Sequence, residues 1–343
     1  MSVLDRRVVL VTGKGGVGKT LVSALLALRA ARAGKRVLLC ETFGCQRVPE
    51  LFGVVSRGYT PVPLAPNLWT SSITSEQALE EYLLRVLKFR KLYELVFRNR
   101  VMGPFMDAVP GLHDLIQLGK VWDLERTRER GAPAWDLLVV DAPATGHGLT
   151  MLGSPRAMME LTVAGPFHDN ATDIARLFED PARTAAVLVT LAEEMPVRET
   201  VDLWGRLGSG RHIVGGVVLN QVHASPVPDA ALFGQLHDRL LTHANAAGIE
   251  AIHDCDAELR RVAAQDTARD RLRQMVAGRG VPVVDVPYLV ELGAEGAPAP
   301  SATPPPGSDL RATPRVAPKA LTTPPPNHVS SHLDALVASL EAL

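Results

Sequence analysis

Gly13-Lys14-Gly15-Gly16-Val17-Gly18-Lys19-Thr20 is the stretch that decides the fold of this 343-residue chain. It fits the pattern G-x-x-x-x-G-K-[ST] at every fixed position. The apolar run 8–11 precedes it, and a helix-compatible stretch, 21–33, follows it and ends at Gly34. Strand, glycine-rich loop and helix in this order predict a phosphate-binding loop, with the helix dipole directed at the phosphates.

The residues of this loop predict a site for MgATP. The glycines allow the backbone to curl around a triphosphate with its N–H groups pointing inward. Lys19 can reach the β- and γ-phosphates, and the Thr20 hydroxyl can ligate Mg²⁺. The loop residues expected to bind the nucleotide are Gly13, Gly15, Gly16, Val17, Gly18, Lys19 and Thr20.

The composition is that of an ordinary globular chain, with 46% hydrophobic and 21% charged residues. The formal net charge of −1 implies no overall attraction to nucleic acid or to an anionic membrane. No run of eighteen apolar residues is present, so no integral membrane segment is expected. Cys40, Cys45 and Cys255 form no C-x-x-C pair, and the chain enters a strand too early for a signal peptide. We therefore expect a cytoplasmic protein.

The arrangement of apolar runs predicts an α/β fold with a doubly wound, mostly parallel sheet covered by helices on both faces. The six runs are 8–11, 37–40, 137–140, 186–189, 213–219 and 281–286. Residues 75–130 contain no such run and have apolar residues at helical spacing, which predicts a helical insertion between the second and third strands.

The composition changes near residue 293, which predicts a boundary there. Residues 1–293 would form the nucleotide-binding domain, and the proline- and alanine-rich stretch 294–329 a disordered linker. Residues 330–343 would form a short amphipathic helix whose apolar stripe has no accompanying Lys or Arg. That stripe favours docking into a protein groove over an anionic membrane, so the tail is expected to contribute little to the stability of the core.

A second motif lies at the end of the third apolar run, where residues 135–149 read WDLLVVDAPATGHGL. An acid that ends a buried strand lies at the edge where open α/β sheets bind their ligands. Asp141 is therefore expected beside the Mg²⁺ bound at Thr20, usually acting through a coordinated water. Thr20 and Asp141 are the predicted metal-binding residues.

Both motifs resemble those of one family. The octapeptide resembles the deviant Walker A motif of MinD, ParA, the nitrogenase iron protein and ArsA. The run from Asp141 to Leu149 closely resembles the switch II signature of ArsA and of the GET-pathway targeting ATPase. The resemblance implies an ATPase that hydrolyses ATP slowly to drive a dimer switch acting on a partner or client. It also implies that Lys14 reaches the other subunit's phosphates and that His147 is a switch residue.

Further segments extend the resemblance over residues 5–292. Residues 189–200 resemble a segment that would make Glu194 a dimer-interface residue. Asn220 lies in a run similar to the V-N-Q whose amide reads adenine, which suits one donor and one acceptor. Pro287 and Tyr288 resemble the short segment that packs over the base.

The expected switch I departs from the family pattern. Residues 38–46 read LLCETFGCQ, and aligning Glu41 with the first acidic position puts Phe43 where the water-positioning aspartate belongs. Either Glu41 substitutes from a shifted position, in a homodimer, or the protein hydrolyses little and acts as an ATP-gated binding module. In the second case a heterodimer with a paralogous ATPase that keeps the aspartate would be active.

The client is not identified by the sequence. The zinc-holding C-x-x-C of the targeting factor is absent. The three cysteines are soft ligands suited to As(III), although buried or incidental cysteines are the simpler interpretation. The apolar residues of 75–130 form either an exposed surface or a layer packed on the sheet. A spatial regulator like MinD is a further alternative.

Overall fold

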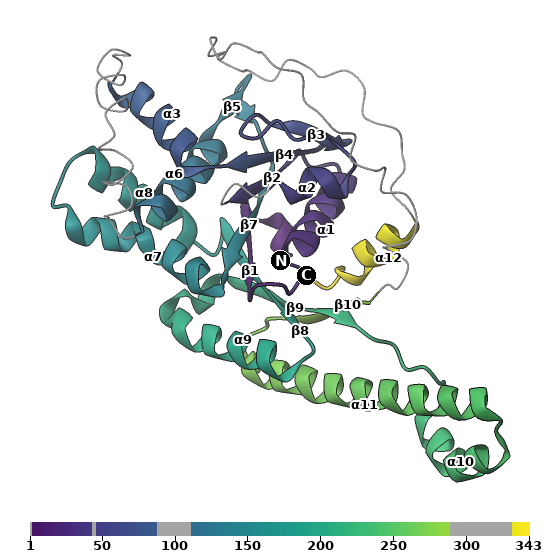
Figure 1. The fold of residues 1–343 in the computed structure, drawn as a ribbon. Helices are drawn as coiled ribbons and strands as arrows, with labels where there is room; N and C mark the ends of the chain where they lie inside the picture. Colours follow the sequence, from purple (N-terminus) through teal and green to yellow (C-terminus); the bar gives the residue numbers. More distant parts are fainter. Residues whose placement is uncertain (1, 43–45, 88–110, 289–330) are drawn as a thin grey trace.

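The computed structural model describes residues 2–42, 46–87, 111–288 and 331–343, apart from some side chains such as those of 145–150 (Figure 1). The predicted linker, Phe43, Cys45 and residues 88–110 lie outside the described residues, as does the side chain of His147.

An eight-stranded sheet forms the centre of the described structure, in the order β10-β9-β8-β1-β7-β2-β4-β3. All neighbouring strands run parallel except β3, which is antiparallel to β4. The strands are β1 (Val8–Gly13), β2 (Val37–Thr42), β3 (Val62–Ala65), β4 (Leu68–Ile73), β7 (Leu137–Ala144), β8 (Thr184–Leu191), β9 (Val214–Val222) and β10 (Val283–Pro287). All six predicted runs are strands, and the predicted α/β fold with a mostly parallel sheet is confirmed.

Helices cover both faces of the sheet because successive residues of a strand point to opposite faces. On one face α1 (Lys19–Arg32) packs on residues such as Val9, Leu39 and Val139. On the other face Leu10, Leu38 and Val140 face the helices that follow in the chain. Those helices are α6 (Leu112–Arg126), α7 (Thr145–Leu161), α8 (Pro166–Glu179) and, beside β8 and β9, α9 (Glu194–Leu207).

Two described helices occupy the predicted insertion, α3 (Ser75–Leu87) and α6. They pack against each other through Leu79 and Leu112. Leu115, Leu118 and Val121 of α6 are buried against the sheet. The described apolar residues of α6 therefore form a layer on the sheet. A short hairpin, β5 (Arg128–Glu129) and β6 (Ala132–Pro133), leads from α6 into β7.

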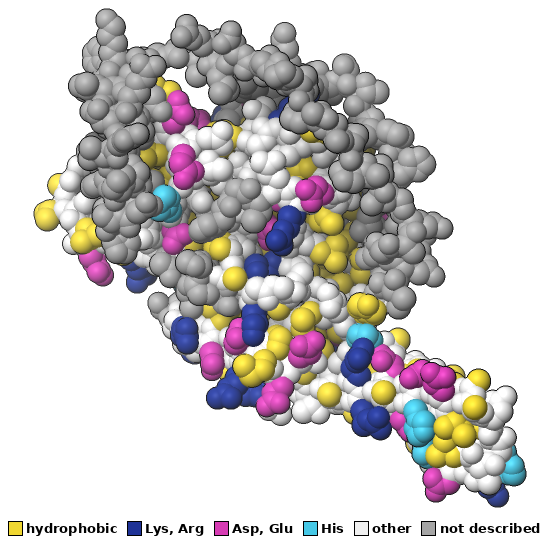
Figure 2. Space-filling view, viewed as in Figure 1, with side chains coloured by type: hydrophobic (Ala, Val, Ile, Leu, Met, Phe, Trp, Pro, Cys, Tyr) yellow, Lys and Arg dark blue, Asp and Glu magenta, His cyan; other side chains and the backbone are white. Residues whose placement is uncertain are grey.

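A helical arm projects from the body between β9 and β10 (Figure 1). It consists of α10 (Ala230–His243) and the 30-residue α11 (Ala246–Met275), and no side chain of α10 is buried. Acidic, basic and histidine side chains are interspersed on the face of the arm seen in Figure 2. Two 3₁₀ helices, η1 (Val3–Asp5) and η2 (Gly208–Ile213), and the short α2 (Arg47–Leu51) complete the described elements before the tail.

The C-terminal helix α12 (Ser331–Ser339) lies against α1 and beside β10. Leu336, Val337, Leu340 and Leu343 are buried in the same core as the apolar residues of α1. Asp334 forms an ion pair of 2.6 Å with Arg32. In this structure the stripe covers α1 and is not free to dock on a partner, whereas the sequence led us to expect a free stripe.

The two ends of the chain meet below α1 (Figure 1). The backbone N–H of Val3 donates to the carbonyl oxygen of Leu343 at 2.8 Å. The hydroxyl of Ser2 donates to the same oxygen at 3.0 Å. In the part of the chain that the structure describes, no helix combines the length and apolar character that crossing a membrane would need.

Candidate nucleotide-binding site

The loop after β1 depends on glycine at two points of close approach. A Cβ at Gly13 would lie 2.1 Å from the carbonyl oxygen of Val189 on β8. Gly18, at φ 88°, directly precedes α1, and a Cβ there would lie 2.2 Å from Nδ2 of Asn220. Both fixed glycines of the motif are thus required by the fold. Gly15 and Gly16 are exposed, so the top of the loop faces open space.

The two halves of the predicted metal site come together at the start of α1. The hydroxyl of Thr20 donates to Oδ2 of Asp141 at 2.6 Å, and that of Ser23 donates to Oδ1 at 3.3 Å. Burial raises the pKa of Asp141, while the Thr20 hydrogen bond and the nearby Lys19 charge oppose the rise. Hydroxyl and carboxylate oxygens are the ligands that Mg²⁺ prefers, so these residues fit the expected cation.

Lys19 and Lys14 lie on the same loop and make different contacts. Nζ of Lys19 donates to the carbonyl oxygen of Lys14 at 3.0 Å. The Lys14 ammonium forms an ion pair of 2.7 Å with Glu199 of α9, and about a third of each of these two side chains is exposed. Within this subunit Lys14 thus has a carboxylate partner, which the sequence did not predict.

Glu41 is a buried residue of β2, with 1% of its surface exposed. Its Oε1 accepts hydrogen bonds from the backbone N–H groups of Arg47 at 2.8 Å and Val48 at 3.0 Å. Oε2 is buried, and no described residue forms a hydrogen bond with it. Burial raises the pKa of Glu41 to about 7, the two backbone hydrogen bonds reduce the rise, and the neighbouring charge of Asp141 adds to it.

The residues expected at the base lie on β9 and β10. Asn220 is buried, and its Nδ2 donates to the carbonyl oxygen of Val17 at 2.9 Å. In this structure the amide holds the phosphate loop through one of the two N–H groups of its nitrogen. Pro287 ends β10 beside Val222. Tyr288 follows it and donates its backbone N–H to Val222 at 2.9 Å.

Tyr288 has an aromatic partner that the sequence did not reveal. Its ring stacks on His223, with centroids 4.5 Å apart and planes 10° from parallel. Nδ1 of His223 lies 2.6 Å from Oε1 of Glu258 on α11. Tyr288 remains 45% exposed, so this stacked pair lies at the surface. His223 stands two residues after the predicted V-N-Q, but nothing in its spacing indicates a partner 65 positions later in the sequence.

The described cysteines do not form a metalloid site. Cys40 is fully buried on β2, and burial raises the pKa of its thiol to about 12. Cys255 lies on α11, in the arm. No group of three His, Cys, Asp or Glu side chains suited to a metal ion occurs among the residues that are described.

Comparison with known proteins shows which family the chain resembles. Residues 6–164 match the family model described as anion-transporting ATPase. ATPase BagA of Mycobacterium tuberculosis is 31% identical over 313 residues, which cover 84% of this chain and 90% of that protein. A protein of Aquifex aeolicus with the provisional name arsenical pump-driving ATPase 2 is 31% identical over 156 residues, or 44% of this chain and 50% of that protein.

Proposed function

The chain belongs to the anion-transporting ATPase (ArsA) family, and from that premise we propose that it binds MgATP in the loop of residues 13–20. We further propose that it hydrolyses ATP slowly to open and close a dimer on a protein partner. The observation that carries this proposal is the 2.6 Å contact between Thr20 and Asp141, which joins the two motifs at the first turn of α1.

The residues of the loop suit the chemistry of phosphoryl transfer. Lys19 would exchange the carbonyl oxygen of Lys14 for the β- and γ-phosphates. The N–H groups of the first turn of α1 would donate hydrogen bonds to the same negatively charged phosphates. Thr20 and Asp141 would hold Mg²⁺, which when bound neutralises charge that develops on the phosphate oxygens. Gly15 and Gly16 would leave room for the phosphates above the loop.

The partly exposed position of Lys14 supports the dimer in this proposal. Its partner Glu199 is itself partly exposed, so Lys14 could leave Glu199 and contact a second subunit without disrupting buried side chains. The dimer would be either a homodimer or a heterodimer with a paralogous ATPase. The partner or client would be a protein.

The test is isothermal titration of ATP in the presence of Mg²⁺ with Lys19→Ala. We expect this variant to lose ATP binding, because the fixed cation at the phosphates is removed. Lys35→Ala is the matched control: Lys35 lies beyond the other end of α1 and contacts Leu4 and Asp5, so its loss should leave the affinity unchanged. Unchanged ATP affinity in Lys19→Ala would overturn the proposed function.

A further inference from the structure

Glu41 and Asp141 are neighbours on adjacent parallel strands. Their Cα atoms are partners in the register of β2 and β7. Residues directly opposite in adjacent strands point to the same face of a sheet. Asp141 accepts hydrogen bonds from Thr20 and Ser23 of α1, so both carboxylates lie on the α1 face, at the end where the phosphate loop begins.

The two oxygens of Glu41 have different surroundings. Oε1 is committed to the N–H groups of Arg47 and Val48 at the start of α2. Oε2 has no hydrogen-bond partner in the part of the chain that the structure describes, although a buried carboxylate oxygen is ordinarily hydrogen-bonded. Capping α2 therefore accounts for one oxygen and leaves the other unexplained. In the described structure Glu41 is the residue of β2 that lies directly opposite Asp141 of β7.

We propose that Glu41 belongs to the cation site, where its Oε2 accepts a hydrogen bond from a water of the Mg²⁺ held by Thr20 and Asp141. The proposal rests on the proposed function and assigns Glu41 a positioning role. Mg²⁺ keeps several waters in protein sites and is held by few carboxylates, so an acceptor behind its water shell suits it. A cation beside Asp141 also compensates a second buried carboxylate, which would otherwise repel the first.

This geometry disfavours the alternative that Glu41 orients the attacking water. Only 1% of the surface of Glu41 is exposed, and one of its oxygens is hydrogen-bonded to α2. A water-orienting carboxylate needs access to the open space above the phosphate loop. The assignment also links the cation to α2, because the same carboxylate holds the first N–H groups of that helix.

The test measures how much Mg²⁺ strengthens ADP binding, as the ratio of the dissociation constants in EDTA and in Mg²⁺. In the wild-type protein we expect a clear gain. In Glu41→Gln the gain should shrink about tenfold or more, the loss typical of a removed partner behind a metal site. The ADP affinity in EDTA should stay within about twofold, because Gln keeps an oxygen for Arg47 and Val48.

Glu50→Gln is the matched control. Glu50 is an exposed acid of α2 whose charge also acts on Glu41, so the variant removes a similar charge outside the site. Its Mg²⁺ gain should equal that of the wild type. An unchanged gain in Glu41→Gln overturns this inference alone. No gain in the wild type itself would instead overturn the Mg²⁺ part of the proposed function.

A measurement on the wild-type protein avoids any folding defect of the variant. Protein labelled with carbon-13 at its glutamate carboxyl groups is loaded with ADP and Mn²⁺ in place of Mg²⁺. Electron–nuclear double resonance should detect a hyperfine coupling between the manganese and a carboxyl carbon. The size of this coupling should match a carboxylate separated from the metal by one water. Absence of that coupling, with Mn²⁺ bound, would overturn the assignment of Glu41.

Discussion

Phe43 is the residue at which the sequence departs from the family pattern for the proposed hydrolysis. A phenyl ring neither accepts a proton nor orients a water, and the residue stands where the resemblance implies an aspartate. Glu41, the sequence alternative, is buried and has one oxygen committed to α2. Hydrolysis by this chain alone should therefore be slow, and a paralogue that retains the aspartate would supply the missing group.

Restoring the carboxylate tests this interpretation. Phosphate release by purified wild-type protein should be slow, and Phe43→Asp should raise it by about 100-fold or more, the range of a positioned acid–base group. Phe43→Asn places a neutral side chain of the same shape as Asp at this position and should not raise the rate. A brisk wild-type rate that disappears in Glu41→Gln would contradict the paralogue model. A brisk rate that survives Lys14→Ala would remove the cross-dimer mechanism.

The sequence predicted single site residues where a motif carries them, and missed contacts between motifs. Gly18, Thr20 and Asp141 follow from local patterns whose geometry is nearly invariant. The bond from Asn220 to Val17 and the ion pair of Lys14 with Glu199 depend on how strands and helices far apart in sequence meet. Side-chain partners of this kind have no local signature.

At the scale of elements, the sheet was predictable where its strands are continuously apolar. β4 was missed because its residues Thr70, Ser71 and Ser72 are polar, yet all three are buried. Thr70 donates to the carbonyl oxygen of Leu39 and Ser71 to that of Tyr59, so the fold supplies partners that the sequence does not show. Tertiary context thus overrides the hydrophobic pattern.

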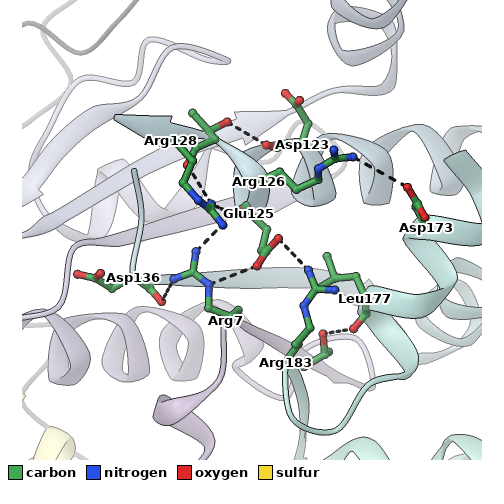
Figure 3. Close-up of polar contacts among 11 residues, drawn as sticks. Arg7, Asp123, Glu125, Arg126, Arg128, Asp136, Asp173, Leu177 and Arg183 are labelled. Carbon is green, nitrogen blue, oxygen red and sulfur yellow. Dashed lines mark hydrogen bonds and ion pairs between the residues drawn. The ribbon is translucent and has the colours of Figure 1, made fainter. Parts of the chain in front are cut away.

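The insertion is fixed to the sheet by a charged cluster at the edge away from the phosphate loop (Figure 3). Glu125 of α6 is buried, and its two oxygens contact Arg7 at 3.3 Å and Arg183 at 2.9 Å. These arginines precede β1 and β8. One carboxylate therefore joins α6 to two strands.

Glu125→Gln should lower the free energy of unfolding in urea by about 2 kcal/mol. Breaking a fully buried ion pair lowers the free energy of unfolding by more than this. Here both arginines are partly exposed, so water screens part of the loss. ATP affinity should not change, because the phosphate loop lies at the opposite ends of the strands. The control is Glu129→Gln, whose pair with Arg36 is more exposed and should be worth under about 1 kcal/mol. Equal losses in the two variants would contradict the structural role of the cluster.

At the scale of the whole molecule, the tail closes the fold. The sequence predicted an apolar stripe at 330–343, and the structure uses it to cover α1. An amphipathic helix shows which side is apolar but not which surface it will meet. For this reason the stripe was predictable and its partner was not.

Two substitutions with the same new charge test this packing. Leu340→Asp should lower the free energy of unfolding by about 3 kcal/mol or more, because Leu340 is fully buried. Ala338→Asp, at an exposed position of α12 two residues earlier, should change it by less than about 0.5 kcal/mol. Similar values for both variants, measured by urea denaturation, would show that the tail is free of the core in solution.

The contact between Arg29 and the carbonyl oxygen of Leu340 joins residues 311 positions apart. A ribosome adding ~5–20 residues per second makes α1 roughly 15 to 60 seconds before the segment that covers it. Throughout that interval the nascent chain carries an apolar helix face without its native cover. Folding of this part of the core is therefore completed only after α12 has been synthesised.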